Sequence, residues 1–309
     1  MRLLWVVAAF LGGMAMAAQS RINGELAVRV GDGVTAALVS FSVGLALVGT
    51  LTLALPAGRA GARRMVAALR DGSLRWWYAL TGLFGAVVVA AQGLAVPTLG
   101  VALFTVGIVA GQTLSGILVD RMGVGVLGAK RITAQRVLGA LVTIAAVAIG
   151  AAAGGFDASS TLLVLLPFAA GMLIALQQAF AGQVQHHTRS ALTQTTSNFL
   201  VGALALGIAV LVRIAGGLEL EPLPAEWWLY LGGPLGCAFI AIAAVAVHRI
   251  GVLALGLASI AGQVVMALVL DLVAPTAGHP VSVLSYVGAG LAIAGVAVST
   301  VRRRPRAAA

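Results

Sequence analysis

Charged residues and cysteine are both scarce in this chain. Only 9% of its 309 residues are charged, 6% are aromatic, and 61% are hydrophobic. About a quarter of the residues in a soluble domain are charged, so this chain cannot cover its apolar surface in water. The single cysteine, Cys237, excludes an intrachain disulfide and a cysteine metal site. The composition therefore predicts an integral membrane protein.

Motifs for cofactor, metal and catalytic chemistry are also lacking. The G-x-G-x-x-G of residues 123–128 follows an apolar segment instead of a strand, and no P-loop lysine motif exists. His186 and His187 are adjacent and cannot share a helix face, which argues against a metal site. No Ser/His/Asp set or carboxylate pair falls at one membrane depth. We expect no cofactor, no metal and no enzymatic activity.

The apolar residues gather in ten segments. A helix that crosses a bilayer needs roughly 20 apolar residues, and each segment is close to that length. The segments lack the period-2 alternation of barrel strands, so the expected fold class is an all-α membrane protein. The ten predicted transmembrane helices cover residues 3–22, 34–55, 75–95, 98–119, 136–153, 160–180, 191–214, 227–247, 250–271 and 281–301.

The basic residues between these segments indicate an orientation. With ten helices and both chain ends in the cytoplasm, sixteen of the 19 Lys and Arg residues fall on the cytoplasmic side, and the exceptions are Arg21, Arg29 and Arg213. Lys and Arg concentrate in cytoplasmic loops, so the split predicts an N-in, C-in protein. The basic tail of residues 302–306 is expected to contact anionic lipid. No folded basic face is evident, so we expect no nucleic-acid partner.

The chain also repeats itself. Residues 10–19 recur as residues 168–177, and Asp120 recurs as Asp271 after one short slip in register. Each half holds five predicted helices, an odd number, so the second half would cross the membrane upside down relative to the first. The predicted units are a first repeat of residues 1–154 and an inverted second repeat of residues 155–309.

Four motifs of the first half combine glycine with amide, hydroxyl or charged residues: Gln19-x-x-x-Asn23-Gly24, Ser40-Phe41-x-x-Gly44, Gly111-Gln112…Asp120-x-x-Gly123 and Arg136-x-x-Gly139. They resemble the DUF606 (YdcZ-like) family of the drug/metabolite transporter (DMT) superfamily, in a fused two-repeat form that covers the whole chain. The second half departs from the motifs, since the repeat matches Asn23 to Ala181 and Ser40 to Asn198. The resemblance implies a DMT/EamA-like fold and a bacterial inner-membrane exporter, without supplying a substrate.

Polar side chains within the apolar segments are the candidates for substrate binding. Lipid tails offer them no partner, so they face neighbouring helices or a cavity. Six of them lie in, or directly after, the first two predicted helices of the two repeats: Gln19, Asn23, Ser40, Gln177, Gln178 and Asn198. They serve either as interhelical hydrogen bonds or as the lining of a central cavity. For Gln112 and Gln263, which each follow a glycine, we favour helix packing.

Two tryptophan pairs stand at the starts of the third and eighth predicted helices. They are Trp76-Trp77 and Trp227-Trp228, and the repeat matches one pair to the other. Tryptophan is enriched at the level of the lipid headgroups, which favours an interfacial anchor. The alternative is an aromatic wall that holds a planar or cationic substrate.

Glu25, Asp120 and Asp271 are the carboxylates near the ends of apolar segments for which we expect a role. Glu25 either pairs with Arg21, four residues before it, or couples transport to protons. Asp120 is expected to be structural and, with an arginine such as Arg136, to tie the fourth predicted helix to the fifth. Asp271 is its structural mate in the second repeat.

These features together predict a secondary transporter that works by alternating access between two inverted halves. The expected substrate is a small organic metabolite or drug-like compound that is moved outward. The predicted cavity lacks a fixed charge, which favours a neutral or amphipathic solute. The alternative function is a non-transporting membrane scaffold or subunit that stabilises partner proteins. The coupling ion and the oligomeric state do not follow from the sequence.

Overall fold

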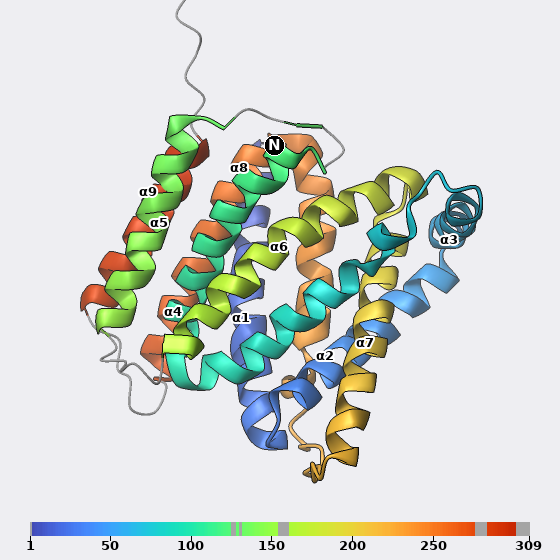
Figure 1. Ribbon diagram of the computed structural model, residues 1–309, viewed down its shortest axis with the longest axis horizontal. Coiled ribbons are helices and arrows are strands. Elements are labelled where there is room, and N and C mark those ends of the chain that lie inside the picture. Colours follow the sequence, from blue (N-terminus) through green and yellow to red (C-terminus); the bar gives the residue numbers. More distant parts are fainter. Residues whose placement is uncertain (1, 125–127, 130–131, 154–160, 276–282, 301–309) are drawn as a thin grey trace, which may run out of the picture.

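The computed structural model describes residues 2–124, 128–129, 132–153, 161–275 and 283–300, and within these ranges the chain is helical without a β-strand (Figure 1). The predicted boundary near residue 154 and the basic tail of residues 302–306 lie outside the described residues. The helices are α1 (Arg2–Val30), α2 (Gly33–Ala54), α3 (Pro56–Arg70), α4 (Thr81–Met122), α5 (Ala134–Ala153), α6 (Thr161–Thr188), α7 (Ala191–Ala215), α8 (Gly232–Val273) and α9 (Val283–Thr300), with 3-10 turns η1 (Trp76–Leu80) before α4 and η3 (Trp227–Tyr230) before α8.

The α1–α2 and α6–α7 turns are built alike, at positions that the repeat matches. Gly31 has a φ of 69° in the first turn, and Arg189 has a φ of 50° in the second. The next residue caps the following helix: Asp32 Oδ1 and Ser190 Oγ each accept a backbone N–H from three residues on, at 2.7 and 3.2 Å. Such caps satisfy an otherwise unpaired N–H group, so α2 and α7 both begin at a defined residue.

Helix α4 contains a sharp break at Gly100. A straight helix of its 42 residues would be about 63 Å long, twice the ~30 Å of the bilayer core. Gly100 has φ 76° and ψ 168°, a backbone conformation open to glycine, and Pro97 removes one backbone donor just before it. The chain reverses direction there, and α8 bends back in a similar way (Figure 1). The predicted segments 75–95 and 98–119 fall on the two arms of α4.

The remaining differences from the predicted segments are two longer helices and one helix that was not predicted. Helices α1 and α6 run on to Val30 and Thr188, beyond the expected ends at residues 22 and 180. The last residues of both helices are more polar than the apolar run that precedes them. A search for apolar segments therefore ends each helix too early. The same search missed α3, an amphipathic helix with buried small residues on one side and exposed arginines on the other.

The two halves make corresponding contacts across the molecule. Helix α1 packs along α8, and α4 packs along α6. A Cβ atom on Gly13 would collide with the carbonyl oxygen of Ser259, and one on Gly171 would collide with that of Ile108. The repeat matches Gly13 to Gly171 and Ile108 to Ser259. Glycine therefore permits the same close crossing at both places.

The repeat matches α2 to α7, so it matches the contact between these two helices to itself. The rings of Phe41 and Phe199 lie 5.0 Å apart between their centroids. Each ring also fills the space beside a glycine of the other helix, Phe41 against Gly202 and Phe199 against Gly44. The repeat matches both the two phenylalanines and the two glycines.

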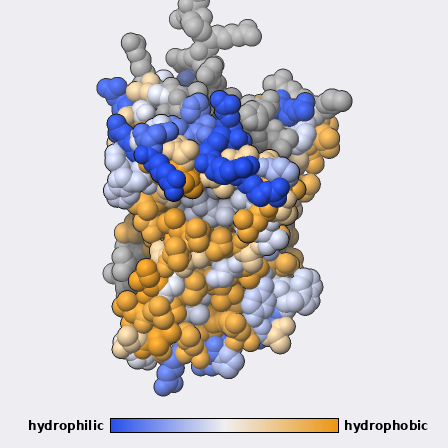
Figure 2. Space-filling view, turned by 90° about the vertical axis from the view of Figure 1, so that its right-hand side faces the viewer, coloured by the Kyte–Doolittle hydropathy of each residue, from blue (hydrophilic) through white to orange (hydrophobic). Residues whose placement is uncertain are grey.

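The surface has a hydrophobic band between two hydrophilic ends (Figure 2). Exposed arginines of α3 and its neighbour mark what we call the α3 end: Arg59, Arg63, Arg64, Arg70 and Arg75. Six of the described helices are long and apolar enough to cross a membrane, by length and composition: Leu3–Val30, Gly33–Ala54, Trp76–Met122, Leu163–Thr188, Ala191–Ala215 and Leu255–Val273. The chain is a multi-pass membrane protein.

Candidate functional site

A buried amide cluster joins α1 to the first arm of α4. Asn23 Nδ2 donates to Gln92 Oε1 at 2.6 Å, and Gln92 Nε2 donates to Ser20 Oγ at 3.1 Å. All three side chains are buried. Sequence reasoning missed Gln92 because the repeat matches it to an apolar residue, Ala243, and so gave no paired signal.

Two acceptor oxygens of this region have no hydrogen-bond partner within the described residues. They are Gln19 Oε1 and Asn23 Oδ1, both fully buried. Both face glycines at the start of α8: a Cβ atom on Gly236 would lie 2.8 Å from Gln19 Oε1, and one on Gly232 would collide with Asn23 Oδ1. Ser40 Oγ faces Gly232 as well, at 2.8 Å from that Cβ position. The structure thus brings Gln19, Asn23 and Ser40 together in a closed site.

A second amide pair lies at the matched place in the other half. Gln177 Nε2 donates to Asn198 Oδ1 at 2.8 Å, linking α6 to α7. A Cβ atom on Gly85 would lie 2.7 Å from Gln177 Nε2. In the first half, a Cβ atom on Gly236 would lie at a similar distance from the Gln19 side chain. Gln178 does not join this pair, because its side chain is exposed on the neighbouring face of α6.

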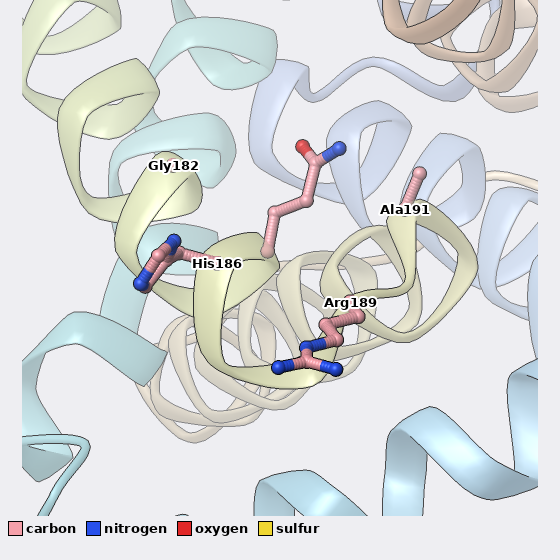
Figure 3. A pocket seen from close by; sticks show the side chains of 5 residues that line it. Gly182, His186, Arg189 and Ala191 are labelled. Carbon is pink, nitrogen blue, oxygen red and sulfur yellow. The ribbon is translucent and has the colours of Figure 1, made fainter. Parts of the chain in front are cut away.

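A cavity of about 500 Å³ adjoins the end of α6 and the start of α7 (Figure 3). Its described lining residues are Gly182, Gln185, His186, Arg189 and Ala191. Gly182 and Gln185 follow Gln178 on one face of α6, since positions 178, 182 and 185 recur at helical spacing, and Arg189 lies in the turn just after the helix. Sequence reasoning counted Arg189 only as an orientation charge and gave Gln185 no role.

The corresponding face of α1 is closed. Gly24, the mate of Gly182, packs so closely on α4 that an added Cβ would lie 2.8 Å from a Val96 methyl and 3.5 Å from Pro97 Cδ. Ser20, the mate of Gln178, is buried in the cluster with Gln92. On α6, by contrast, Gln178 is exposed and Gly182 lines the cavity. The two halves therefore differ at this place.

Ion pairs close the end of the molecule opposite the α3 end. Arg29 Nη1 lies 3.0 Å from Glu226 Oε1, and Arg29 Nε lies 3.5 Å from Glu25 Oε1. Arg213 Nη2 lies 2.6 Å from Oδ2 of buried Asp32. The partner of Glu25 is thus Arg29 and not Arg21, as the sequence had suggested. A glutamate four residues before its arginine is the more favourable order on a helix, which explains the difference.

Two aspartates tie helices together. Asp271 Oδ1 and Oδ2 accept the N–H groups of Val101 and Ala102, at 2.9 and 2.6 Å, where the second arm of α4 begins. Arg136 Nη2 donates to Asp120 Oδ2 at 2.6 Å and links α4 to α5. The role of Asp271 as a cap across the two halves was not anticipated, although Gly100 after Pro97 signalled a helix start.

The tryptophan pairs lie on the surface. Trp76 and Trp227 are 65% and 72% exposed, and Trp77 and Trp228 are 38% exposed each. The described lining of the cavity contains no tryptophan. These positions favour the interfacial anchor over the aromatic wall.

Two glutamines lie beside close helix crossings. Gln112 and Gln263 are half-buried, and each follows a glycine whose added Cβ would meet a carbonyl oxygen of the neighbouring helix. Their place is that expected of packing residues.

Comparisons with known proteins agree with the resemblance in the motifs. Residues 4–149 and 162–298 both match the family described as "Putative inner membrane exporter, YdcZ". A solved structure, titled only as the crystal structure of a protein, is similar with a TM-score of 0.53 and 19% identity over 97% of each chain, which shows the fold alone. No curated protein matches the chain. The chain therefore belongs to the YdcZ family of the DMT superfamily, as two fused copies of the family's domain.

Proposed function

We propose that this membrane transporter exports a small organic metabolite or drug-like compound across the bacterial inner membrane by alternating access. Each arm of α4 and α8 crosses the bilayer separately, which gives ten spanning helices in two inverted five-helix repeats. Inverted repeats place the substrate at their interface, where one half is open while its mate is closed.

The observation that carries the proposal is the difference between two matched faces. On α1, Ser20 and Gly24 are sealed against α4, whereas their mates on α6, Gln178 and Gly182, are exposed or line the cavity. Exchange of these two arrangements would close the cavity at the α3 end and open the opposite end. The ion pairs of Arg29 and Arg213 would then break.

The orientation proposed for this state is open to the cytoplasm. The α3 end carries the exposed arginines, and Arg64 Nε donates to the Thr188 carbonyl at 2.7 Å beside the cavity. The opposite end carries Arg29 and Arg213, each paired with a carboxylate. The positive-inside rule then places the α3 end and the cavity in the cytoplasm.

The proposed substrate contacts are the two amide sites. In the open half, Gln177 bonds to Asn198 and directly precedes the exposed Gln178 on α6, and in the closed half Gln19 and Asn23 carry unpaired acceptors. An unpaired buried acceptor costs about 1–3 kcal/mol, which a donor group of the solute would offset once α8 moves away.

The test is accessibility from the two membrane sides. In a Cys237→Ser background, Gln178→Cys and Ser20→Cys are made separately and treated with a membrane-impermeant maleimide in inside-out and right-side-out vesicles. Gln178→Cys should react in inside-out vesicles, and Ser20→Cys should react slowly and only in right-side-out vesicles. If both react from the same side, the halves are not inverted and the proposal is wrong.

A further inference from the structure

We infer that the cavity at the end of α6 is an oxyanion site, in which Arg189 and His186 bind a carboxylate or phosphate group. In Figure 3 the two side chains leave the end of α6 in different directions, so the guanidinium of Arg189 is the main donor and His186 lies at the rim of the cavity. Both residues are exposed at the edge of a cavity of about 500 Å³ that is largely open to the surface.

The polar lining belongs to the second copy alone. The repeat matches Gln185, His186 and Arg189 to Ala27, Val28 and Gly31. Ala27 is 6% exposed and packs against Gly93, whereas Val28 and Gly31 are exposed but offer no side-chain hydrogen-bond donor. The donors therefore do not follow from the shared fold.

Arg189 occupies a backbone conformation that favours glycine. Its φ of 50° is left-handed, and within the described residues no other non-glycine residue has a positive φ. The matched residue in the first copy is Gly31, with a φ of 69°, so glycine is sufficient to form this turn. A side chain kept at such a position at an energetic cost indicates a function for that side chain. An orientation charge would not need this position.

Arg189 has no carboxylate within ion-pair distance among the described residues. The adjoining α3 contributes further positive charge, with Arg64 bonded to the carbonyl of Thr188. Asp71, at the end of α3, accepts the N–H of Ser73 at 2.9 Å and forms no ion pair with Arg189. The guanidinium is therefore available to an external anion.

The donor types fit an oxyanion. A guanidinium presents two parallel N–H groups that match the two oxygens of a carboxylate or phosphate. The imidazole of His186 and the amide of Gln185 supply further donors at the rim of the cavity. This charge favours an acidic ligand, in contrast to the neutral solute expected from the amides alone. The anion is a group of a free solute or a lipid headgroup, and the chemistry of the site is the same for both.

The test measures binding in detergent, without transport. Purified protein is titrated with inorganic phosphate at constant ionic strength in chloride, and the melting temperature is followed. The wild type and Arg63→Gln, which removes an exposed arginine outside the cavity, should show the same saturable rise. Arg189→Lys should bind at least about tenfold more weakly. Arg189→Gly should lose the response and, with its backbone relaxed, melt slightly higher than the wild type without phosphate.

Two further outcomes show whether the anion comes from a lipid headgroup and whether the site exists. If phosphate has no effect but nanodiscs of phosphatidylglycerol stabilise the wild type and not Arg189→Gly, relative to phosphatidylcholine, the oxyanion is a lipid headgroup. If neither probe distinguishes Arg189→Gly from the wild type, the site does not exist. Binding is read without transport, so a failed carrier function would leave this result unchanged. That the transported solute itself is acidic rests on the proposed function.

Discussion

At the scale of single residues, buried amides in this protein are not equivalent. Asn23 donates to Gln92, whereas no hydrogen bond of the Gln19 side chain is found within the described residues. Removing an unpaired group costs little, and removing one partner of a buried pair leaves the other unsatisfied. The four-residue spacing of Gln19 and Asn23 on α1 did not reveal this difference. The hydrogen bonds of each amide depend on which atoms of α4 and α8 lie beside it.

Gln19→Leu should therefore leave the melting temperature unchanged or raise it, since the unpaired Oε1 is removed. Asn23→Leu should lower the free energy of unfolding by about 1–3 kcal/mol, because Gln92 Oε1 loses its donor. Thermal unfolding in detergent compares the two variants. Equal losses in both would mean that Gln19 has a partner in solution.

Substrate binding should respond differently from stability. Gln19→Leu and Asn198→Leu should each weaken the affinity for a transported solute about tenfold, the value of one hydrogen bond of ~1.4 kcal/mol. Leucine is well tolerated in a lipid environment, so the folded protein should persist. Calorimetry with a solute found by thermal-shift screening measures the effect. Unchanged affinity in both variants would assign these amides to helix packing.

At the scale of elements, the sequence predicted most of the helices and little of their joints. Apolar length located the long helices, and the repeat matched the helices of one half to those of the other. The α4 break was visible only as a glycine after a proline, and its cap, Asp271, lies 170 residues from Val101 in the sequence. Contacts that distant come from the packing of the two halves and not from local pattern. The same reason hid Gln92, whose partners lie on α1.

The cap on α4 should be worth about 1–2 kcal/mol. Asp271→Ala should lower the free energy of unfolding by this amount, because Val101 and Ala102 lose their acceptor. Asp271→Asn should cost less, since its carbonyl oxygen still accepts one N–H. Leu272→Ala, at an exposed position beside it, is the control for loss of side-chain volume in thermal unfolding. Equal melting of Asp271→Ala and this control would exclude a capping role.

At the scale of the whole molecule, the proposed closed end is held by few charges. Arg213→Gln removes the pair with Asp32 and leaves the cap on α2, because Asp32 Oδ1 still accepts the Thr35 N–H. In the Cys237→Ser background, this change should speed the labelling of Ser20→Cys from the side opposite α3. Arg63→Gln should leave the labelling rate unchanged. No acceleration in Arg213→Gln would show that this ion pair does not hold the end closed.

The paired phenylalanines between α2 and α7 have a consequence for how such a carrier could be tuned. Because Phe41 and Phe199 exchange places under the repeat, their contact would map onto itself in the proposed exchange of roles between the two halves. An interaction that is identical before and after a change contributes nothing to the difference in free energy between the two states. A stronger or weaker Phe41–Phe199 contact would therefore change how tightly the two halves associate. It would not shift the equilibrium between the inward-facing and outward-facing states.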